Sequence, residues 1–261
     1  SEPSVTPTIW PEVTTNPTQV PGATDIPPQG DSFSPAISSN GRYVVFVSRA
    51  GGLLEGDNYQ CQSHNGTSYN CSDIFLYDRQ SSNLQLISSA PDGQPANGDS
   101  FSPAISEDGR WIAFVSEATN LTEKRIGSLG LFLYDLQNEH LELIAPSGRD
   151  PSISGDGRFV AYSGGMSSWN VYIYDQNKGM SDQISRAWDG QAADGDSIVP
   201  QISANGRWGA FWSWAGNLIP DHTEICRENE TVNYSCGDVF IFDRETGLME
   251  RIAVGESYGL G

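Results

Sequence analysis

The sequence predicts an all-β protein: a β-propeller of four recognisable four-stranded blades, preceded by an extended arm rich in proline and threonine. Three observations lead to this prediction. One stretch of apolar and turn residues recurs four times, and a shorter apolar motif follows each copy. No segment shows the 3.6-residue periodicity of a convincing amphipathic helix. Self-similarity at a period of roughly 48 to 68 residues indicates a repeat architecture built from one supersecondary unit.

The longer motif contains Asn-Gly-Arg or Asp-Gly-Arg after its first few residues and then an apolar run. Its four copies are Asp31–Ser48, Asp99–Ser116, Asp150–Ser163 and Asp196–Ser213. The shorter motif, D-I-F-L-Y-D in its first version, begins at Asp73, Leu131, Val171 and Asp238. An isoleucine then closes each unit, at Ile87, Ile144, Ile184 and Ile252. The predicted blades therefore span about 31–89, 99–145, 149–185 and 196–253, within a domain of residues 31–261.

The first unit shows how each blade is predicted to form. Its expected strands are Ser34–Ser38, Arg42–Ser48, Asp73–Asp78 and Leu84–Ser88. The second of these is apolar almost without interruption, which favours a strand buried on both faces. The Asn-Gly and Asp-Gly pairs are expected to supply the positive φ that a tight hairpin needs. These pairs begin at Asn40, Asp108, Asp156 and Asn205.

The wording of the repeat also resembles a known family. The pattern I-S-x-D/N-G-R-x-V-A-F-x-S, followed by D-V-F-x-Y-D-R, is similar to the TolB-type, WD-like propeller repeat from Asp31 to about Ala253. The third unit, which is short and lacks the Gly-Asp-Ser lead-in, diverges most. The resemblance implies that the first strand of each blade lines a central channel, and that the second-to-third loops share a face with the blade linkers. It implies no single function, since the family serves as a binding or scaffolding platform in many settings.

Residues 1–30 differ in composition from the rest of the chain. Prolines alternate there with threonines, and Val5, Ile9 and Trp10 form the densest apolar cluster. Because proline fixes φ and removes a backbone donor, the segment should stay extended. The segment is interpreted as a stalk or linker whose threonines could carry O-linked glycans. The sharper hypothesis is an assembly arm that lies along the edge of a neighbouring subunit.

Charge and composition exclude several classes of partner. The formal net charge is −19 in 261 residues, and nucleic-acid affinity depends mainly on Lys and Arg neutralising phosphates. We therefore expect no nucleic acid as partner. No run approaches the 18 or more apolar residues of a spanning helix, so no membrane insertion is expected either. Nothing in the sequence indicates a cofactor.

Two insertions between the second and third strands carry all four cysteines. Cys61 and Cys71 lie ten residues apart in the first unit, as do Cys226 and Cys236 in the fourth. Matched spacing at matched positions predicts two local disulfides and therefore an oxidising environment. The alternative is a zinc site that includes His64 or His222, but zinc sites usually pair cysteines two to four residues apart.

The same loops carry N-x-S/T sequons. They stand at Asn65, Asn70, Asn120, Asn229 and Asn233. Five sequons, all in second-to-third loops, predict covalent glycans on one face of an exported protein. The alternative is that Asn and Ser are simply common in loops, and Asn70, next to Cys71, is the weakest candidate.

The sequence gives only unspecific signals for a catalytic or metal site. Residues 255–259, G-E-S-Y-G, match a nucleophile elbow around Ser257, but the position follows the last blade, where a linker is expected, and no Asp and His partners follow. No catalytic residue, metal ligand or cofactor site is therefore predicted. The recurring aspartates are expected to hydrogen-bond turn backbone rather than bind calcium. They are Asp31, Asp99 and Asp196 in the lead-ins and Asp78, Asp135, Asp175 and Asp243 in the shorter motifs.

Three functions fit these observations. The leading one is a non-enzymatic extracellular or cell-surface propeller that binds copies of itself or another surface protein, assembling head to tail through its arm. The second is the accessory propeller of a larger secreted hydrolase of the prolyl-oligopeptidase kind. The third is a glycan- or peptide-binding receptor module that uses tryptophans, although most of these lie in apolar strands and are expected in the core. The tryptophans concerned are Trp111, Trp208, Trp212 and Trp214.

Overall fold

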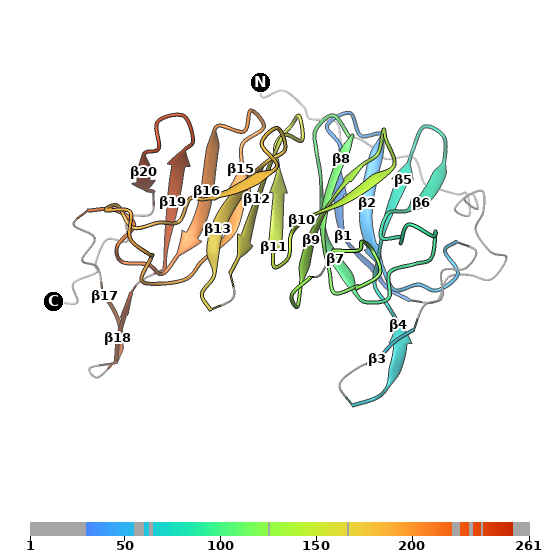
Figure 1. Cartoon of the computed structure of the whole chain (residues 1–261), viewed down its shortest axis with the longest axis horizontal. Coiled ribbons are helices and arrows are strands. Elements are labelled where there is room, and N and C mark those ends of the chain that lie inside the picture. The colour runs from blue at the N-terminus through green and yellow to red at the C-terminus, as the bar shows by residue number, and fades with distance from the viewer. Residues whose placement is uncertain are drawn as a thin grey trace, which may run out of the picture.

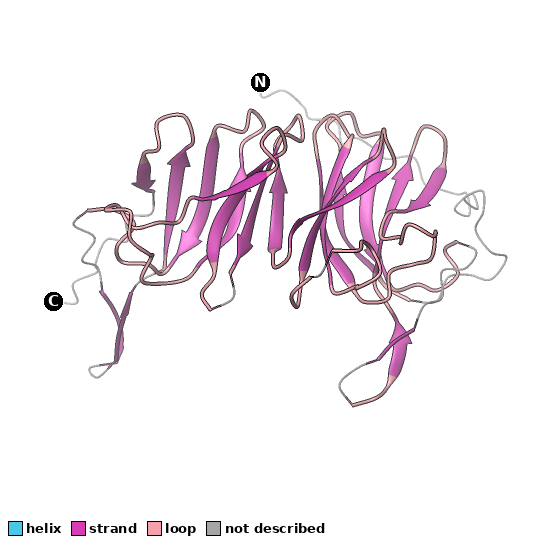
Figure 2. Ribbon diagram, viewed as in Figure 1, coloured by secondary structure: helices cyan, strands magenta, loops and turns pink. Residues whose placement is uncertain are grey.

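The computed structural model describes residues 30–54, 60–62, 65–124, 126–165, 167–220, 225–229, 232–235 and 237–252, with backbone alone for the two short stretches 225–229 and 232–235. Figure 2 shows strands, turns and loops in these ranges, and none of them forms a helix. Within them, no helix is long and apolar enough to cross a membrane. The predicted arm, with Val5, Ile9 and Trp10, lies outside the described residues.

Four antiparallel four-stranded sheets form the blades, as the repeats predict. Blade 1 contains β1 (Ser32–Ile37), β2 (Tyr43–Ser48), β5 (Asp73–Asp78) and β6 (Asn83–Leu86). Blade 2 contains β7 (Ser100–Ile105), β8 (Trp111–Ser116), β9 (Gly130–Asp135) and β10 (His140–Ala145). Blade 3 contains β11 (Arg149–Ile153), β12 (Phe159–Gly164), β13 (Asn170–Asp175) and β14 (Met180–Gln183). Blade 4 contains β15 (Ser197–Ile202), β16 (Trp208–Ser213), β19 (Asp238–Asp243) and β20 (Met249–Arg251).

Two further hairpins interrupt the first and last blades between their second and third strands. One pairs β3 (Gln60–Gln62) with β4 (Ser68–Asn70), and the other pairs β17 (Ile225–Asn229) with β18 (Val232–Ser235). Both project from the same side of the row of blades (Figure 1). The two cysteine-bearing insertions therefore have matching positions in the fold, as their matching places in the repeat suggest.

The turn between the first two strands of each blade depends on glycine. Gly41 has a φ of 68°, while the Oδ1 atom of Asn40 accepts hydrogen bonds from the backbone of Arg42 and the hydroxyl of Ser38. The pairs thus supply a positive φ as predicted, and the glycine is the residue that adopts it in each of these four turns. The Asn or Asp instead caps the turn with its side-chain oxygen, a role that suits its short polar side chain.

The first strand of every blade contains a bulge that the sequence analysis did not anticipate. The register shifts in β1, β7, β11 and β15, next to one residue with φ of 51–52°. These residues are Ser34, Ser102, Asp150 and Val199, and each precedes a proline. A β-branched residue such as Val199 rarely adopts positive φ. Because the bulge recurs in all four blades, it belongs to the fold.

Three apolar interfaces join the blades in chain order. Ile74 and Leu76 of blade 1 pack with Phe114 and Phe132 of blade 2, and similar clusters join blades 2 and 3 and blades 3 and 4. The first strands of consecutive blades contact one another, as expected for strands that line the inside of a propeller. Figure 1 shows blade 1 and blade 4 at opposite ends of the row. Across the described residues, therefore, the four blades form an open arc rather than a closed ring.

Candidate interaction surface

An ion pair recurs in every blade between the arginine of the Gly-Arg turn and the aspartate that ends the third strand. In blade 1, Arg42 donates from Nε and Nη2 to the two carboxylate oxygens of Asp78 at 2.9 and 2.8 Å. The equivalents are Arg110 with Asp135, Arg158 with Asp175 and Arg207 with Asp243. The guanidinium lowers the pKa of each of these carboxyl groups, to about 2 for Asp135.

The same aspartates also accept backbone N–H groups from the turn that follows them. Asp78 accepts from Gln80, and the three equivalents accept from Gln137, Asn177 and Glu245. The predicted role of these aspartates in holding turns is therefore confirmed. The sequence analysis did not predict the arginine partner. The sequence does contain a signal for it, since the arginine and the aspartate both recur at fixed positions in all four units.

Two of the three lead-in aspartates, Asp99 and Asp196, link their blade to the one before it. The Asp99 carboxylate accepts hydrogen bonds from the Ser72 backbone N–H at 2.7 Å and from its hydroxyl at 2.8 Å. Asp196 accepts from the Trp169 N–H at 2.9 Å in the same way. No group of three or more Asp, Glu, His or Cys side chains converges within the described part of the chain.

An aromatic side chain packs on glycine wherever one blade meets the next. A Cβ atom at Gly109 would lie 2.6 Å from the Tyr43 ring of the preceding blade. At Gly157 it would lie 2.0 Å from the Trp111 ring. Real Cβ atoms do not approach carbon this closely, so the aromatic residue at the start of each second strand requires glycine in the following blade.

The joint between blades 3 and 4 adds an arginine to this arrangement. The Phe159 ring of blade 3 lies against Gly206, where a Cβ would be 2.2 Å away. The Arg244 guanidinium of blade 4 lies 3.6 Å from the centre of that ring, and its Nη1 donates to the Gly206 carbonyl at 2.6 Å. Burial lowers the pKa of Arg244. Phe159 is thus held between a glycine and a cation, the geometry of a cation–π contact.

The outer flank of blade 4 exposes positions that are buried elsewhere. Trp208, Trp212 and Val239 are 38%, 37% and 39% exposed. The prediction that the strand tryptophans are core residues is wrong for Trp208 and Trp212, because no following blade covers them among the described residues. Trp111, at the corresponding place in blade 2, is half-buried between blades. Trp214 lies in the loop after β16, half-buried, with its ring 4.0 Å from that of Trp212.

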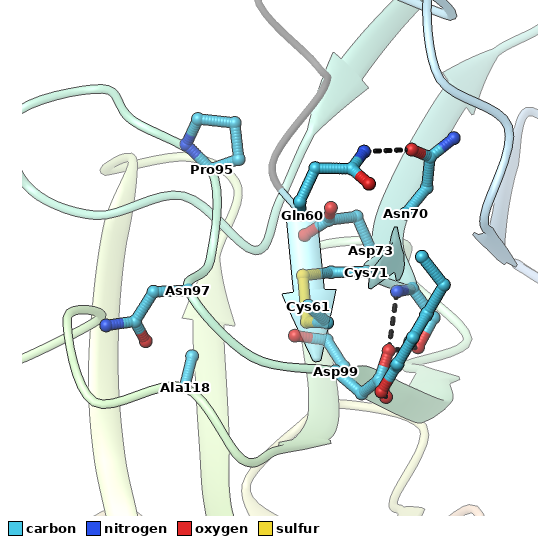
Figure 3. The surroundings of a disulfide bond; sticks show 12 residues. Gln60, Cys61, Asn70, Cys71, Asp73, Pro95, Asn97, Asp99 and Ala118 are labelled. Atoms are coloured by element: carbon cyan, nitrogen blue, oxygen red, sulfur yellow. Dashed lines mark hydrogen bonds between the residues drawn. A yellow bond between two sulfur atoms is a disulfide. The ribbon is translucent and has the colours of Figure 1, made fainter. Parts of the chain in front are cut away.

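The β3–β4 hairpin is closed by the first predicted disulfide (Figure 3). Cys61 and Cys71 are bonded, with their Cα atoms 5.0 Å apart, and both are buried. The Tyr69 hydroxyl donates to Asp99 of blade 2 at 2.7 Å, which anchors the hairpin across the joint and raises the pKa of Tyr69. The second predicted disulfide cannot be compared in this way, because the side chains of Cys226 and Cys236 lie outside the described part.

The sequons differ in how their side chains are used. Asn65 is exposed at the tip of the β3–β4 hairpin, and its Oδ1 accepts from the Thr67 backbone N–H at 3.1 Å. The Nδ2 atom of Asn70 donates to the Arg49 carbonyl, and its Oδ1 accepts from Gln60 (Figure 3). Of the remaining sequons, Asn229 and Asn233 have described backbone only, in β17 and β18.

Asn120 holds a blade linker in place. Its Nδ2 donates to the Pro95 carbonyl at 3.0 Å and its Oδ1 accepts from the Asn97 N–H at 2.9 Å. Asn217 makes the equivalent contacts in blade 4, with the Ala192 carbonyl and the Asp194 N–H, although it is not part of a sequon. The recurrence identifies a structural role for this asparagine position.

The other candidate residues are not brought together. His140 is exposed at the start of β10, while His64, His222 and Ser257 lie outside the described residues. A surface pocket with a volume of about 640 Å³ lies between blades 1 and 2 and is lined by residues including Gln85, Tyr134 and His140. It contains no convergent set of catalytic groups.

Comparison with known proteins supports the architecture. No family model and no curated protein matches the sequence. The chain is similar to the β-propeller domain of the Trilobed protease from Pyrococcus furiosus, with 14% identity and a TM-score of 0.50 over 86% of this chain and 57% of that chain. The fold is a β-propeller. A puromycin-hydrolysing peptidase from Mycobacterium tuberculosis is also similar, with 12% identity and a TM-score of 0.51 over 85% of this chain and 28% of that chain.

TolB from Acinetobacter baumannii is among the similar structures, with 17% identity and a TM-score of 0.48 over 85% of this chain and 43% of that chain. The propeller fold expected from the repeats is confirmed by the four sheets and by the similarity to the propeller domain of the Trilobed protease. At these identities the likeness extends to the fold and not to activity. The chain spans less than two thirds of each of these proteins.

Proposed function

We propose that this chain is a non-enzymatic, extracellular or cell-surface propeller that acts as a structural or interaction module. Its partners are copies of itself, or another surface protein, and it associates head to tail into chains or filaments through its N-terminal arm. The observation that carries the proposal is the apolar outer flank of blade 4. Large apolar side chains gathered at one exposed surface favour a protein–protein contact.

The use of the charged residues supports a structural role over a catalytic one. The recurring arginines and aspartates of the blades are paired with each other, and Asp99 and Asp196 hold the backbone of the preceding blade. A catalytic group should break this symmetry, with a perturbed pKa caused by something other than the repeated pair. In the described part of the chain the lowered carboxyl pKa values all belong to the repeated pair.

The disulfide and the exposed sequon support the extracellular location. Disulfides persist mainly in oxidising compartments. Asn65 presents its sequon at a hairpin tip stiffened by the Cys61–Cys71 bond, so an oligosaccharide there would point away from the blades. We propose Asn65 as a glycan acceptor, because its side chain is exposed, whereas the Nδ2 atoms of Asn70 and Asn120 donate to backbone carbonyls that hold the fold.

The accessory propeller of a larger hydrolase is the second candidate. It is favoured by the similarity to a propeller domain of a protease and to a peptidase, each of which is matched over only part of its length. A fluorophosphonate probe tests the non-enzymatic assignment: it should leave Ser257 unlabelled, and stoichiometric labelling of Ser257 would contradict that assignment. An accessory propeller serves a nucleophile outside residues 1–261, so labelling of the natural protein outside these residues would favour the second candidate.

The arm hypothesis is tested by removing residues 1–30 and measuring mass by light scattering over a range of concentrations. We expect the full chain to form assemblies and the truncated chain to lose them. An assembly that survives truncation unchanged would assign the segment the role of a stalk.

A further inference from the structure

Blade 1 contains a copy of the site that holds Phe159 in the joint between blades 3 and 4, and no aromatic ring of the described residues fills it. In that joint Gly206 and Arg244 form the site, with the Arg244 Nη1 bonded to the Gly206 carbonyl at 2.6 Å. In blade 1 the Arg79 Nη1 donates to the Gly41 carbonyl at 2.7 Å, so the same pair is built in the same way. We call this pair, Gly41 and Arg79, the blade 1 cradle.

The blade 1 cradle differs from the filled site in what lies against it. A Cβ at Gly206 would meet the Phe159 ring at 2.2 Å, whereas among the described residues a Cβ at Gly41 would meet only the Nη1 of Arg79, at 3.5 Å. Gly206 is buried and Arg244 is half-buried, but Gly41 is half-buried and Arg79 is exposed. The cradle thus has the backbone and the cation of an aromatic-binding joint without an aromatic ring from the described residues.

Blade 4 presents the matching aromatic side chain at the other end of the arc. Trp208 begins β16, as Phe159 begins β12, and follows an arginine that stacks on its ring at 4.8 Å, as Arg158 does on Phe159 at 4.6 Å. Phe159 is 5% exposed and Trp208 is 38% exposed. Tryptophan is also the aromatic residue that binds a cation most strongly.

The rest of the two flanks is apolar at equivalent positions. In blade 2 the residues that face blade 3 include Ala113, Val115 and Leu131, all 0% exposed. Their equivalents in blade 4 are Ala210, Trp212 and Val239, of which the last two are more than a third exposed. On blade 1 the half-buried Val44, Phe46 and Tyr77 occupy the places of the buried Ile112, Phe114 and Tyr134 of blade 2.

We infer that the blade 4 flank of one copy docks on the blade 1 flank of a second copy, with Trp208 seated in the cradle formed by Gly41 and Arg79. The contact continues the blade-to-blade joint that the chain already forms three times. It rests on the proposed head-to-tail association and adds a contact between the blade flanks to that of the arm. Because the two surfaces differ, the contact is heterologous and generates either a closed ring of blades or an open chain.

The backbone of the joint is compatible with this docking. Between blades 1 and 2 the Ser39 N–H donates to the Glu107 carbonyl at 3.0 Å, and between blades 3 and 4 the Gly155 N–H donates to the Ala204 carbonyl at 2.8 Å. These four residues occupy the same place in the repeat. The Ala204 N–H of one copy should therefore meet the Ser39 carbonyl of the next.

The experiment measures the mass of the full chain and its variants by sedimentation equilibrium across concentration, at physiological salt because the net charge of −19 opposes association at low salt. Trp208→Ala removes the ring and Arg79→Glu reverses the cation. Each should weaken association on the order of tenfold or more, as expected for a central aromatic or arginine contact. Trp208→Phe should keep association, since phenylalanine fills the equivalent site. The control Trp188→Ala, which removes a tryptophan that is 63% exposed in the loop after blade 3, should have no effect.

Mixing provides the test of direction. The Trp208→Ala chain keeps the cradle and the Arg79→Glu chain keeps Trp208, so an equimolar mixture should form a two-chain species and nothing larger. A mixture that stays monomeric would overturn the inference. So would a Trp208→Ala chain that associates like the original. If removal of residues 1–30 then abolishes association, the proposed function stands and the flank contact falls. If the original chain is monomeric at every concentration, both fall.

Discussion

Replacing Gly157 with alanine tests whether the blades are joined by an aromatic ring packed on glycine. Gly157 has a φ of +74°, and a Cβ there would lie 2.0 Å from Cδ1 of Trp111. Gly179, in the turn between β13 and β14, has a φ of +63° and no atom within 4 Å of the same position. Alanine at either site incurs the left-handed backbone cost of about 1 to 2 kcal/mol. Only Gly157→Ala must also displace a ring, which adds about 1 to 3 kcal/mol for overpacking.

The expected losses in the free energy of unfolding are therefore roughly 1 to 2 kcal/mol for Gly179→Ala and 2 to 5 kcal/mol for Gly157→Ala. Thermal unfolding followed by near-ultraviolet circular dichroism measures them, since each kcal/mol should lower Tm by about 2 to 4 °C in a chain of this size. Trp111→Ala in the Gly157→Ala background should cost less than the sum of the two single changes, because the clash is gone. Equal Tm values for the two alanine variants would refute the packing described for this joint.

Three other predictions concern the loops and the ion pairs. Peptide mapping without reduction should find Cys61 bonded to Cys71 and Cys226 bonded to Cys236; each bond should contribute about 2 to 3 kcal/mol, and a link between the two hairpins or an unpaired thiol would contradict this. On protein from its native source, Asn65→Gln should remove one glycan mass, and an unchanged mass would exclude a glycan at Asn65. The lowered carboxyl pKa values predict stability that is present above the unfolded value of about 4 and is lost as pH falls toward about 2. Asp135→Asn should reduce that loss in a pH series of Tm values, and an identical pH profile would count against the Arg110–Asp135 pair.

The repeated units made most of the fold predictable. The Gly-Arg turns and the apolar second strands, such as Tyr43–Ser48, fix two adjacent strands and their register in every blade. The first disulfide also followed from the matched insertions. In each case the interactions that determine the structure are local in sequence and recur, so the repeated residue pattern is enough to predict them.

Features that depend on contact between blades were harder to predict. Trp208 and Trp111 occupy the same place in the repeat, but their burial differs because only Trp111 has a following blade against it among the described residues. Position within a repeat cannot distinguish an inner blade from an end blade. The bulge at Val199 was missed for another reason, since a positive φ at a β-branched residue before proline opposes local preference.

The role of Asn120 shows the same limit for the candidate sites. Its N-L-T sequence is a sequon, yet its side chain makes the two backbone contacts that Asn217 makes without a sequon. The tripeptide shows only that a modifying enzyme could recognise the site. The three-dimensional structure shows whether the Nδ2 atom of the asparagine already donates a hydrogen bond within the fold.

Hydrogen exchange measured across protein concentration tests the flank contact most directly. The amides of residues 203–209 in blade 4 and 38–43 in blade 1 should exchange more slowly as concentration rises, and should do so together. The amides of residues 107–111, which already contact both neighbouring blades within the chain, should be unaffected. Exchange in both end turns that is independent of concentration, while the chain associates, would contradict the account and place the contact elsewhere.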